Sequence, residues 1–207
     1  MKLLILILLA TTLTSSAQIF EGKMTYSNTY QSKLPNLKSE QLNSMMGTKQ
    51  EYYIKGNNYK SLFNGLFTKM QIYQGEENRS YTLTAKSDTL YWEDYSKNKD
   101  VVVNFETQKN KDTIMNISCD VLIVSTDKSK TYYYYSSKYG INPEMFIKHN
   151  YGNWYYIVSK TKALPLKTVH ETAQFILTST AIEIKPMELD KQFFDILDKN
   201  KTAPATW

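Results

Sequence analysis

The chain of 207 residues carries 25 basic and 20 acidic side chains, for a formal net charge of +5. Arg79 is the only arginine. Proteins that recognise nucleic acids or phosphates rely on the bidentate fork of arginine, so no nucleic-acid partner is expected.

The single cysteine, Cys119, excludes an intrachain disulfide. The apolar run Val121–Val124 follows it, so we expect Cys119 to be a buried core thiol.

The first 17 residues have the pattern of a cleavable signal peptide. Lys2 precedes the apolar stretch Leu3–Ala10, and Ser15 and Ala17 supply the small residues that signal peptidase needs. The apolar stretch is shorter than the ~20 residues that cross a bilayer. We therefore expect cleavage between Ala17 and Gln18, release into the periplasm and no membrane span afterwards, with an uncleaved anchor as the alternative.

The remainder of the chain predicts one domain. Removing 17 residues from 207 leaves about 190, a length that suits a single hydrophobic core. We place this domain at residues 18–198. The polar residues 199–207 are expected to form a flexible tail.

Many short segments of the domain have the composition of β-strands. Tyrosine, of which there are 17, and β-branched residues favour strands, and turn signals such as Gly56-Asn57 separate the segments. The spacing of about ten residues is typical of an antiparallel meander. The expected strands are Ile19–Tyr30, Glu51–Lys55, Asn58–Phe63, Thr68–Gln74, Asn78–Thr84, Asp88–Glu93, Val101–Gln108, Cys119–Thr126, Lys130–Ser136, Trp154–Lys160, Pro165–Thr172 and Gln174–Lys185.

Two segments favour helices instead. Asn36–Met46 starts with a residue that can cap a helix and is followed by Gly47, which can end one. Asn142–His149 has a capping asparagine and Pro143 in its first turn.

No combination of residues in the sequence indicates catalysis or a metal site. The two histidines, His149 and His170, have no histidine or cysteine partner at ligand spacing. The acidic pairs Glu76/Glu77 and Glu93/Asp94 lie at the ends of predicted strands, where the side chains of neighbouring residues point to opposite faces unless the backbone turns. We expect no enzymatic activity, no metal and no cofactor.

The segment that starts at Asp94 alternates oxygen-bearing side chains like a calcium-binding loop. Such a loop needs glycine at its sixth position and glutamate at its twelfth, where this chain has Lys99 and Phe105. The segment is therefore interpreted as a polar turn.

The apolar residues that should face inward are the candidates for a ligand site. Methionine suits loose and adaptable apolar sites, and five methionines fall on predicted inward faces. A solid core made of the same residues is the alternative. The candidate cavity-lining residues are Met24, Tyr26, Leu37, Leu42, Met45, Met46, Met70, Ile72, Met145 and Phe146.

Five stretches together resemble a known group of exported proteins. They are Phe20–Tyr26, Glu51–Gly56, Cys119–Val124, Lys162–Lys167 and Glu188–Phe194. They are similar to a small exported bacterial domain of unknown function, which itself resembles the lipoprotein-carrier superfamily of LolA and LolB. The resemblance implies a mainly β (α+β) fold: a single antiparallel sheet curled into an unclosed half-barrel, with two short helices covering the concave face.

In lipoprotein carriers the concave cavity takes acyl chains, which burial of apolar surface stabilises at about 25 cal/mol per Å². The expected function is therefore that of a periplasmic, non-enzymatic binding or carrier protein for a lipid or other apolar ligand. The alternative is a structural or protein-interaction module of the cell envelope with no small-molecule ligand. In that case exposed tyrosines of the run Tyr132–Tyr135 would contact an envelope protein.

Overall fold

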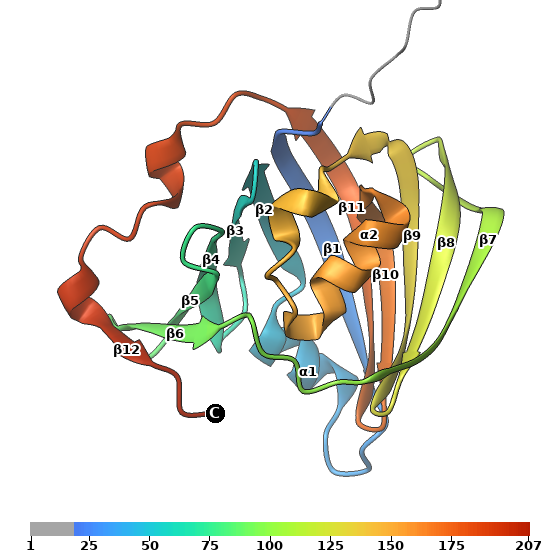
Figure 1. The fold of residues 1–207 in the computed structure, drawn as a ribbon. Helices are drawn as coiled ribbons and strands as arrows, with labels where there is room; N and C mark the ends of the chain where they lie inside the picture. The colour runs from blue at the N-terminus through green and yellow to red at the C-terminus, as the bar shows by residue number, and fades with distance from the viewer. Residues whose placement is uncertain (1–18) are drawn as a thin grey trace, which may run out of the picture.

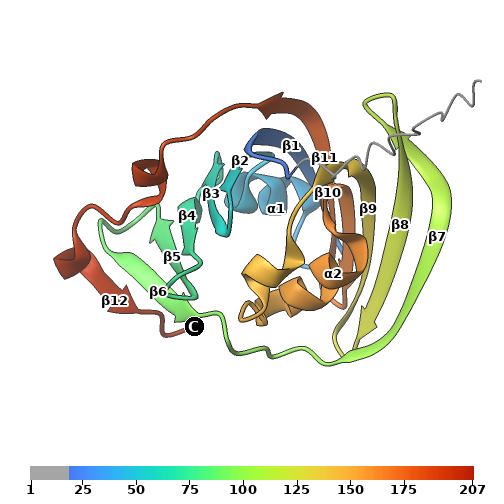
Figure 2. The same ribbon diagram turned by 45° about the horizontal axis from the view of Figure 1, so that its top comes forward.

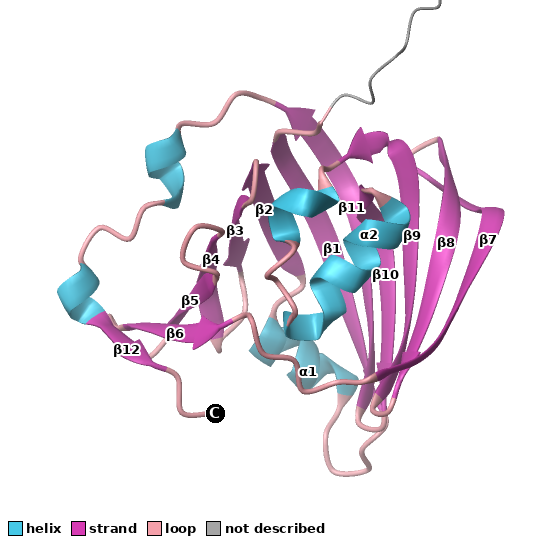
Figure 3. Cartoon of the chain, in the orientation of Figure 1, coloured by secondary structure: helices cyan, strands magenta, loops and turns pink. Residues whose placement is uncertain are grey.

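The computed structural model describes residues 19–207, and the predicted signal peptide lies outside these residues. One sheet of twelve strands dominates the fold (Figure 3), in the order β12-β6-β5-β4-β3-β2-β1-β11-β10-β9-β8-β7. All neighbours pair antiparallel except β12, which runs parallel to β6. The strands are β1 (Gly22–Ser32), β2 (Lys49–Lys55), β3 (Asn58–Phe63), β4 (Thr68–Gln74), β5 (Arg79–Thr84), β6 (Leu90–Asp94), β7 (Val102–Ile114), β8 (Ile117–Thr126), β9 (Ser129–Gly140), β10 (Ala163–Thr172), β11 (Phe175–Pro186) and β12 (Thr202–Pro204).

The sheet is curled but not closed, and β7 and β12 form its two edges. Helix α2 (Trp154–Thr161) and the 3-10 turns η1 (Pro143–Phe146) and η2 (Tyr151–Asn153) lie inside the curve, as Figure 2 shows. Helix α1 (Ser39–Met46) packs on β1 at one end of the curl (Figure 1). Within residues 19–207, none of the helices has the length and apolar character needed to cross a membrane.

The predicted meander is confirmed for most of its strands. Strands β3 and β4 have the predicted bounds, and the Gly56-Asn57 signal forms a two-residue turn in which Lys55 pairs with Asn58. Gly56 has a φ of 58°, which glycine adopts without steric cost. Strand β7 extends beyond its predicted end to Ile114, because its outer half still pairs with β8.

The strand predicted at Trp154–Lys160 is wrong, because this segment forms helix α2. Its buried residues Ile157, Val158 and Thr161 are spaced as on one face of a helix. The helix ends at Lys162, which has a φ of 51° and donates its N–H to the Val158 carbonyl oxygen at 2.8 Å. Packing against the sheet therefore overrides the strand preference of this aromatic and β-branched sequence.

Both predicted helices are shorter than expected. Helix α1 begins at Ser39 rather than near Asn36, and it ends at Gly47 as predicted. In the second segment only η1 forms. There Asn142 caps as predicted, because its Oδ1 accepts the Glu144 N–H at 3.1 Å.

Residues 141–162 form the connection between the paired strands β9 and β10. Hydrogen bonds between the Ile141 N–H and the Lys162 carbonyl oxygen, at 3.0 Å, close this segment at its base. On its far side, the N–H groups of Asn150 and Tyr151 both donate to the Tyr95 carbonyl oxygen. We call residues 141–162 the inserted segment. The first bond closes the segment on itself, and the other two attach it to the chain directly after β6.

Within the tail predicted from residue 199, Thr202–Pro204 form β12. The preceding chain crosses the outer face of the sheet, where Leu189, Phe194 and Ile196 form a second apolar cluster with Ile72 and Tyr81. The main cluster lies on the concave side and contains Met24, Val158 and Leu166. Cys119 is fully buried in it, and this confirms the predicted core thiol.

Replacing Phe194 with alanine tests the role of the C-terminal chain. Phe194 is 2% exposed, so Phe194→Ala should lower the free energy of unfolding by about 3–5 kcal/mol in denaturant titrations. Leu197 is 96% exposed three residues later, and Leu197→Ala should change stability by less than about 0.5 kcal/mol. Equal effects of the two substitutions would contradict this packing.

Candidate functional site

Three adjoining hollows lie between the sheet and the inserted segment. The central hollow has a volume of about 300 Å³ and the small hollow about 150 Å³. They share Gln50, Tyr52 and Trp154. The large hollow, of about 560 Å³, shares Gln71 and Tyr151 with the central one. Because they share lining residues the three hollows adjoin one another, and we call them together the concave cavity; the volumes of the central and large hollows are in the size range of small-molecule sites.

The lining of each hollow is as follows. The central hollow is lined by Gln50, Tyr52, Tyr59, Ser61, Gln71, Tyr95, Tyr133, His149, Tyr151, Gly152, Trp154 and Ile157. The small hollow is lined by Tyr26, Gln50, Tyr52, Trp154, Leu164, Pro165, Thr168 and Ser179. The large hollow is lined by Tyr30, Met46, Phe63, Phe67, Thr68, Gln71, Thr82, Thr84, Glu93, Tyr151 and Trp207.

A row of stacked tyrosines runs along one wall of the cavity. Tyr52, Tyr59 and Tyr73 come from the adjacent strands β2, β3 and β4, and Tyr59 is paired directly with Tyr73. Their ring centroids are 5.5 Å and 4.8 Å apart. The row continues from Tyr73 through Tyr95 to Tyr151. The rings of Tyr95 and Tyr151 are parallel within 4°, and their centroids are 4.3 Å apart. Such offset stacks stabilise the wall beyond the burial of their area.

The hydroxyl groups of this wall are held by hydrogen bonds. Tyr73 donates to Asn78 Oδ1 at 2.7 Å, and Tyr26 donates to the Pro165 carbonyl oxygen at 2.9 Å. Gln71 donates from Nε2 to the Tyr95 hydroxyl at 3.0 Å. The rings of Tyr73 and Tyr95 are therefore held both by stacking and by a hydrogen bond at the hydroxyl.

His149 is the one buried histidine on this wall among residues 19–207. It is 2% exposed, and its Nε2 lies 2.8 Å from the Tyr59 hydroxyl. Burial lowers its pKa to about 3, so the ring is neutral at pH 7. Burial also raises the pKa of Tyr59 well above its ordinary value. His149 and Tyr59 are therefore both neutral at physiological pH.

Two polar atoms of the wall have no hydrogen-bond partner among the described residues: His149 Nδ1 and Trp154 Nε1, both shielded from solvent. Trp154 is the first residue of α2 and lies where the small and central hollows meet. A buried polar group without a partner costs about 1–3 kcal/mol, so each atom calls for an explanation.

Charged side chains are scarce around the cavity. Among the described residues that line the central and small hollows there is no Lys, Arg, Asp or Glu, and Glu93 is the one such residue around the large hollow. Residues 19–207 also contain no group of three or more His, Cys, Asp or Glu side chains that could hold a metal ion.

The candidate residues named from the sequence are distributed over both faces of the sheet. Tyr26 lines the small hollow and Met46 the large one. Met24 and Phe146 belong to the main core cluster without lining a hollow. In and next to α1, Leu42 is buried, whereas Leu37 and Met45 are half-buried, and Met145 in η1 is exposed.

The inward orientation predicted for Met70 and Ile72 is wrong. Both residues pack in the outer cluster under Leu189 and Phe194. Tyr73, next to Ile72 in β4, points into the concave side, as the alternation of a strand requires. The prediction failed because it took the more aliphatic face of β4 to be the inner one. The C-terminal chain covers that face instead.

Sequence reasoning missed His149, Trp154 and the tyrosine row. The signal for the row was present, because the Gly56-Asn57 turn fixes the register that brings Tyr52 and Tyr59 to one face. Trp154 could not be found, because its segment was assigned to a strand.

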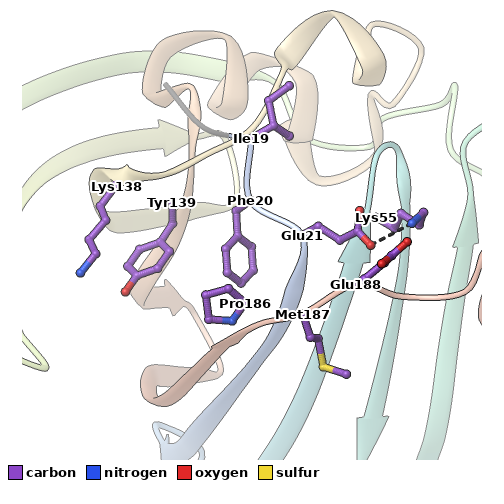
Figure 4. Close-up of a pocket in the computed structure, with 9 residues that line it drawn as sticks. All are labelled: Ile19, Phe20, Glu21, Lys55, Lys138, Tyr139, Pro186, Met187 and Glu188. Carbon is purple, nitrogen blue, oxygen red and sulfur yellow. Dashed lines mark hydrogen bonds and ion pairs between the residues drawn. The ribbon is translucent and has the colours of Figure 1, made fainter. Parts of the chain in front are cut away.

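A separate pocket of about 610 Å³ lies at the rim of the sheet, and Figure 4 shows its lining. Phe20 and Tyr139 meet edge-to-face there at 5.5 Å. Glu21 pairs with Lys55 at 2.9 Å and also accepts the Leu189 N–H at 2.7 Å. These contacts join β1 to β2 and to the C-terminal chain. The pocket shares no lining residue with the concave cavity, so we assign it a structural role.

Comparison with known proteins finds no match in sequence and only weak similarity in structure. No protein family and no curated protein matches the chain. A structure of PNGF-II in the P21 space group is similar over 90% of this chain and 31% of that one, with 13% identity and a TM-score of 0.47. A structure of PNGF-II in the C2 space group covers 88% and 31%, with 14% identity and a TM-score of 0.43. The chain thus spans less than a third of the PNGF-II chain.

The buried histidines should make stability depend on pH. Burial lowers the pKa of His149 to about 3 and also lowers that of His170. Below the ordinary pKa of about 6.5, the unfolded chain therefore binds protons that the folded protein does not. The free energy of unfolding should fall by about 1.4 kcal/mol per pH unit for His149 alone as pH drops from 6 to 5.

Two variants show which histidine causes this dependence of the free energy of unfolding on pH. Denaturant titrations between pH 7 and 5 give the free energy of unfolding at each pH. In His149→Gln this free energy should fall less steeply with decreasing pH, by most of the effect of one bound proton. His170, which contacts Thr131 Oγ1 at 2.8 Å, is less buried than His149, so His170→Gln should remove less. A slope that His149→Gln leaves unchanged would contradict the burial of a neutral His149.

Proposed function

We propose that this protein is a non-enzymatic periplasmic carrier or binding protein, which holds a lipid or other apolar ligand in the concave cavity. The observation that carries the proposal is the presence of three adjoining hollows, largely free of charged side chains, inside the curved sheet. A ligand there gains about 25 cal/mol for each Å² of apolar surface it buries. An unclosed half-barrel with helices inside its curve is also what the resemblance to lipoprotein carriers implies.

The electrostatics of the cavity support a binding role rather than catalysis. General acid–base catalysis at neutral pH needs a group that titrates near that pH. Burial lowers the pKa of His149 to about 3 and raises that of Tyr59, so both hold their protonation states across the neutral range.

Ligand retention through purification is the direct test. Protein isolated from its host without detergent should release an apolar molecule on organic extraction and show its added mass in native mass spectrometry. Ser61→Phe places a ring in the central hollow and should reduce the occupancy several-fold, since Ser61 lines it and is buried. Leu62→Phe, one residue along β3 and on the opposite face, is the matched control.

Both variants need an unfolding curve to show that they fold. Equal occupancy in the two folded variants, or no bound molecule in the original protein, would contradict the proposal.

Interaction with an envelope protein is a second candidate, which edge strand β7 favours. Its outer side has no strand neighbour in the described sheet, and Val103 and Phe105 are exposed. An open edge offers N–H and C=O groups to an extended partner peptide. The run Tyr132–Tyr135 does not supply the surface expected from the sequence, because it lies in β9 between β8 and β10 and is buried or half-buried.

The two candidates separate in a pull-down from envelope extracts. If β7 binds a protein, Val103→Lys should abolish capture of a stoichiometric partner, with ligand occupancy unchanged. Capture that survives this substitution would exclude the edge as the interface.

A further inference from the structure

The large hollow contains a carboxylate without a positively charged partner. Glu93 in β6 lines this hollow, and among the described residues no lysine or arginine lies within ion-pair distance of it. The side chain is half-buried, and its oxygens are not among the unpartnered polar atoms that are shielded from solvent. The carboxylate can therefore be reached by a ligand in the hollow.

The alternation of residues along β6 fixes the direction of this carboxylate. Trp92 packs in the outer cluster, with the Arg79 guanidinium 4.2 Å from its ring centroid, so the neighbouring Glu93 points to the concave side. Burial raises the pKa of Tyr151, and the negative charge of Glu93 raises it further. The carboxylate therefore lies near the last ring of the tyrosine row.

Aromatic rings form much of the remaining lining of the large hollow. Trp207 meets the ring of Tyr91 at 5.4 Å, and Tyr91 precedes Glu93 by two residues on the same face of β6. Aromatic faces attract organic cations, and the attraction grows when the cation leaves water. A carboxylate beside such rings suits a positive charge attached to an apolar body. The aromatic lining residues are Tyr30, Phe63, Phe67, Tyr151 and Trp207.

We infer that the ligand is a cationic amphiphile, whose ammonium group lies against the Glu93 carboxylate and the rings of Tyr151 and Trp207. The inference rests on the proposed carrier function and narrows its ligand class. The apolar part of the molecule lies along Phe63 and Phe67 in the same hollow. An anionic head group is a poor ligand there, because Glu93 repels it and no lysine or arginine is among the described lining residues.

Three probes with the same decyl chain separate the effects of the head group. Decyltrimethylammonium is a cation, decyl glucoside is uncharged and rich in hydroxyl groups, and decyl sulfate is an anion. In calorimetric titrations of the lipid-stripped protein, below the micelle concentrations, the cation should bind about fivefold more tightly than the glucoside, and the anion most weakly. The chain has a formal net charge of +5, so attraction by the protein as a whole would favour the anion instead.

Glu93→Gln removes the negative charge and keeps the shape of the side chain. It should weaken binding of the cation about fivefold and leave binding of the glucoside unchanged. Asp94→Asn is the matched control, because it makes the same change in net charge at the next residue of β6, which is exposed and on the opposite face. This control should affect neither probe.

The indole N–H signals locate the head group. The chain has three tryptophans, so a nitrogen–proton correlation spectrum contains three indole signals, which single Trp→Phe variants assign. Decyltrimethylammonium should shift the signal of Trp207, which lines the large hollow. The signal of Trp92 should stay in place, because this residue packs in the outer cluster.

The outcomes distinguish this inference from the carrier function itself. Glucoside binding as tight as that of the cation, equal weakening by Glu93→Gln and Asp94→Asn, or cation binding with the Trp207 signal unmoved would overturn the inference and leave the carrier function standing. Binding of none of the three probes, together with no apolar molecule extracted from the purified protein, would overturn both. The comparison of probes uses the unaltered chain, so it stands even if Glu93→Gln fails to fold.

Discussion

The closure of the inserted segment at its base and its attachment to Tyr95 at its middle are the constraint on which the cavity depends. A curved single sheet has an apolar concave face that must be covered. Residues 141–162 cover it. The Ile141–Lys162 backbone bond closes the base of the segment, where the chain leaves β9 and enters β10, and two bonds to the Tyr95 carbonyl oxygen hold its middle to the chain after β6. Side-chain bonds from Asn98 to Asn153 and from Asn150 to Ser96 strengthen the second attachment. Held at these two places, the segment lies over the concave face, and hollows remain between it and strands β2, β3 and β4.

Tyrosine is suited to the wall that faces these hollows. An aliphatic wall of the same area would tend to collapse, because a void forfeits contacts on one side. Here each ring is supported by its neighbours in the stack, and the hydroxyls of Tyr26 and Tyr73 have partners outside the open space. The wall therefore keeps its shape and still offers apolar faces to a ligand.

The sequence predicted the parts of the fold that local rules govern. Alternating residues and the Gly56-Asn57 turn located β2, β3 and β4 closely, because strand pairing across short turns depends on neighbours in the chain. Helix α2 was missed because the packing of Ile157 and Val158 against distant strands decides its state. Met70 and Ile72 were assigned to the wrong face because only the fold reveals that residues 187–204 cover the outside of the sheet. Most residues that line the site are brought together by contacts between segments far apart in the chain. Of the candidates predicted from the sequence, only Tyr26 and Met46 line the cavity.

A crystal structure of the protein purified without detergent tests the central claim most directly, which is that the inserted segment keeps a ligand cavity open against the tyrosine wall. The account predicts elongated density in the concave cavity, in contact with the rings of Tyr52 and Tyr59. A structure in which residues 141–162 pack directly onto Tyr52 and Tyr59, so that side chains fill the space, would contradict it.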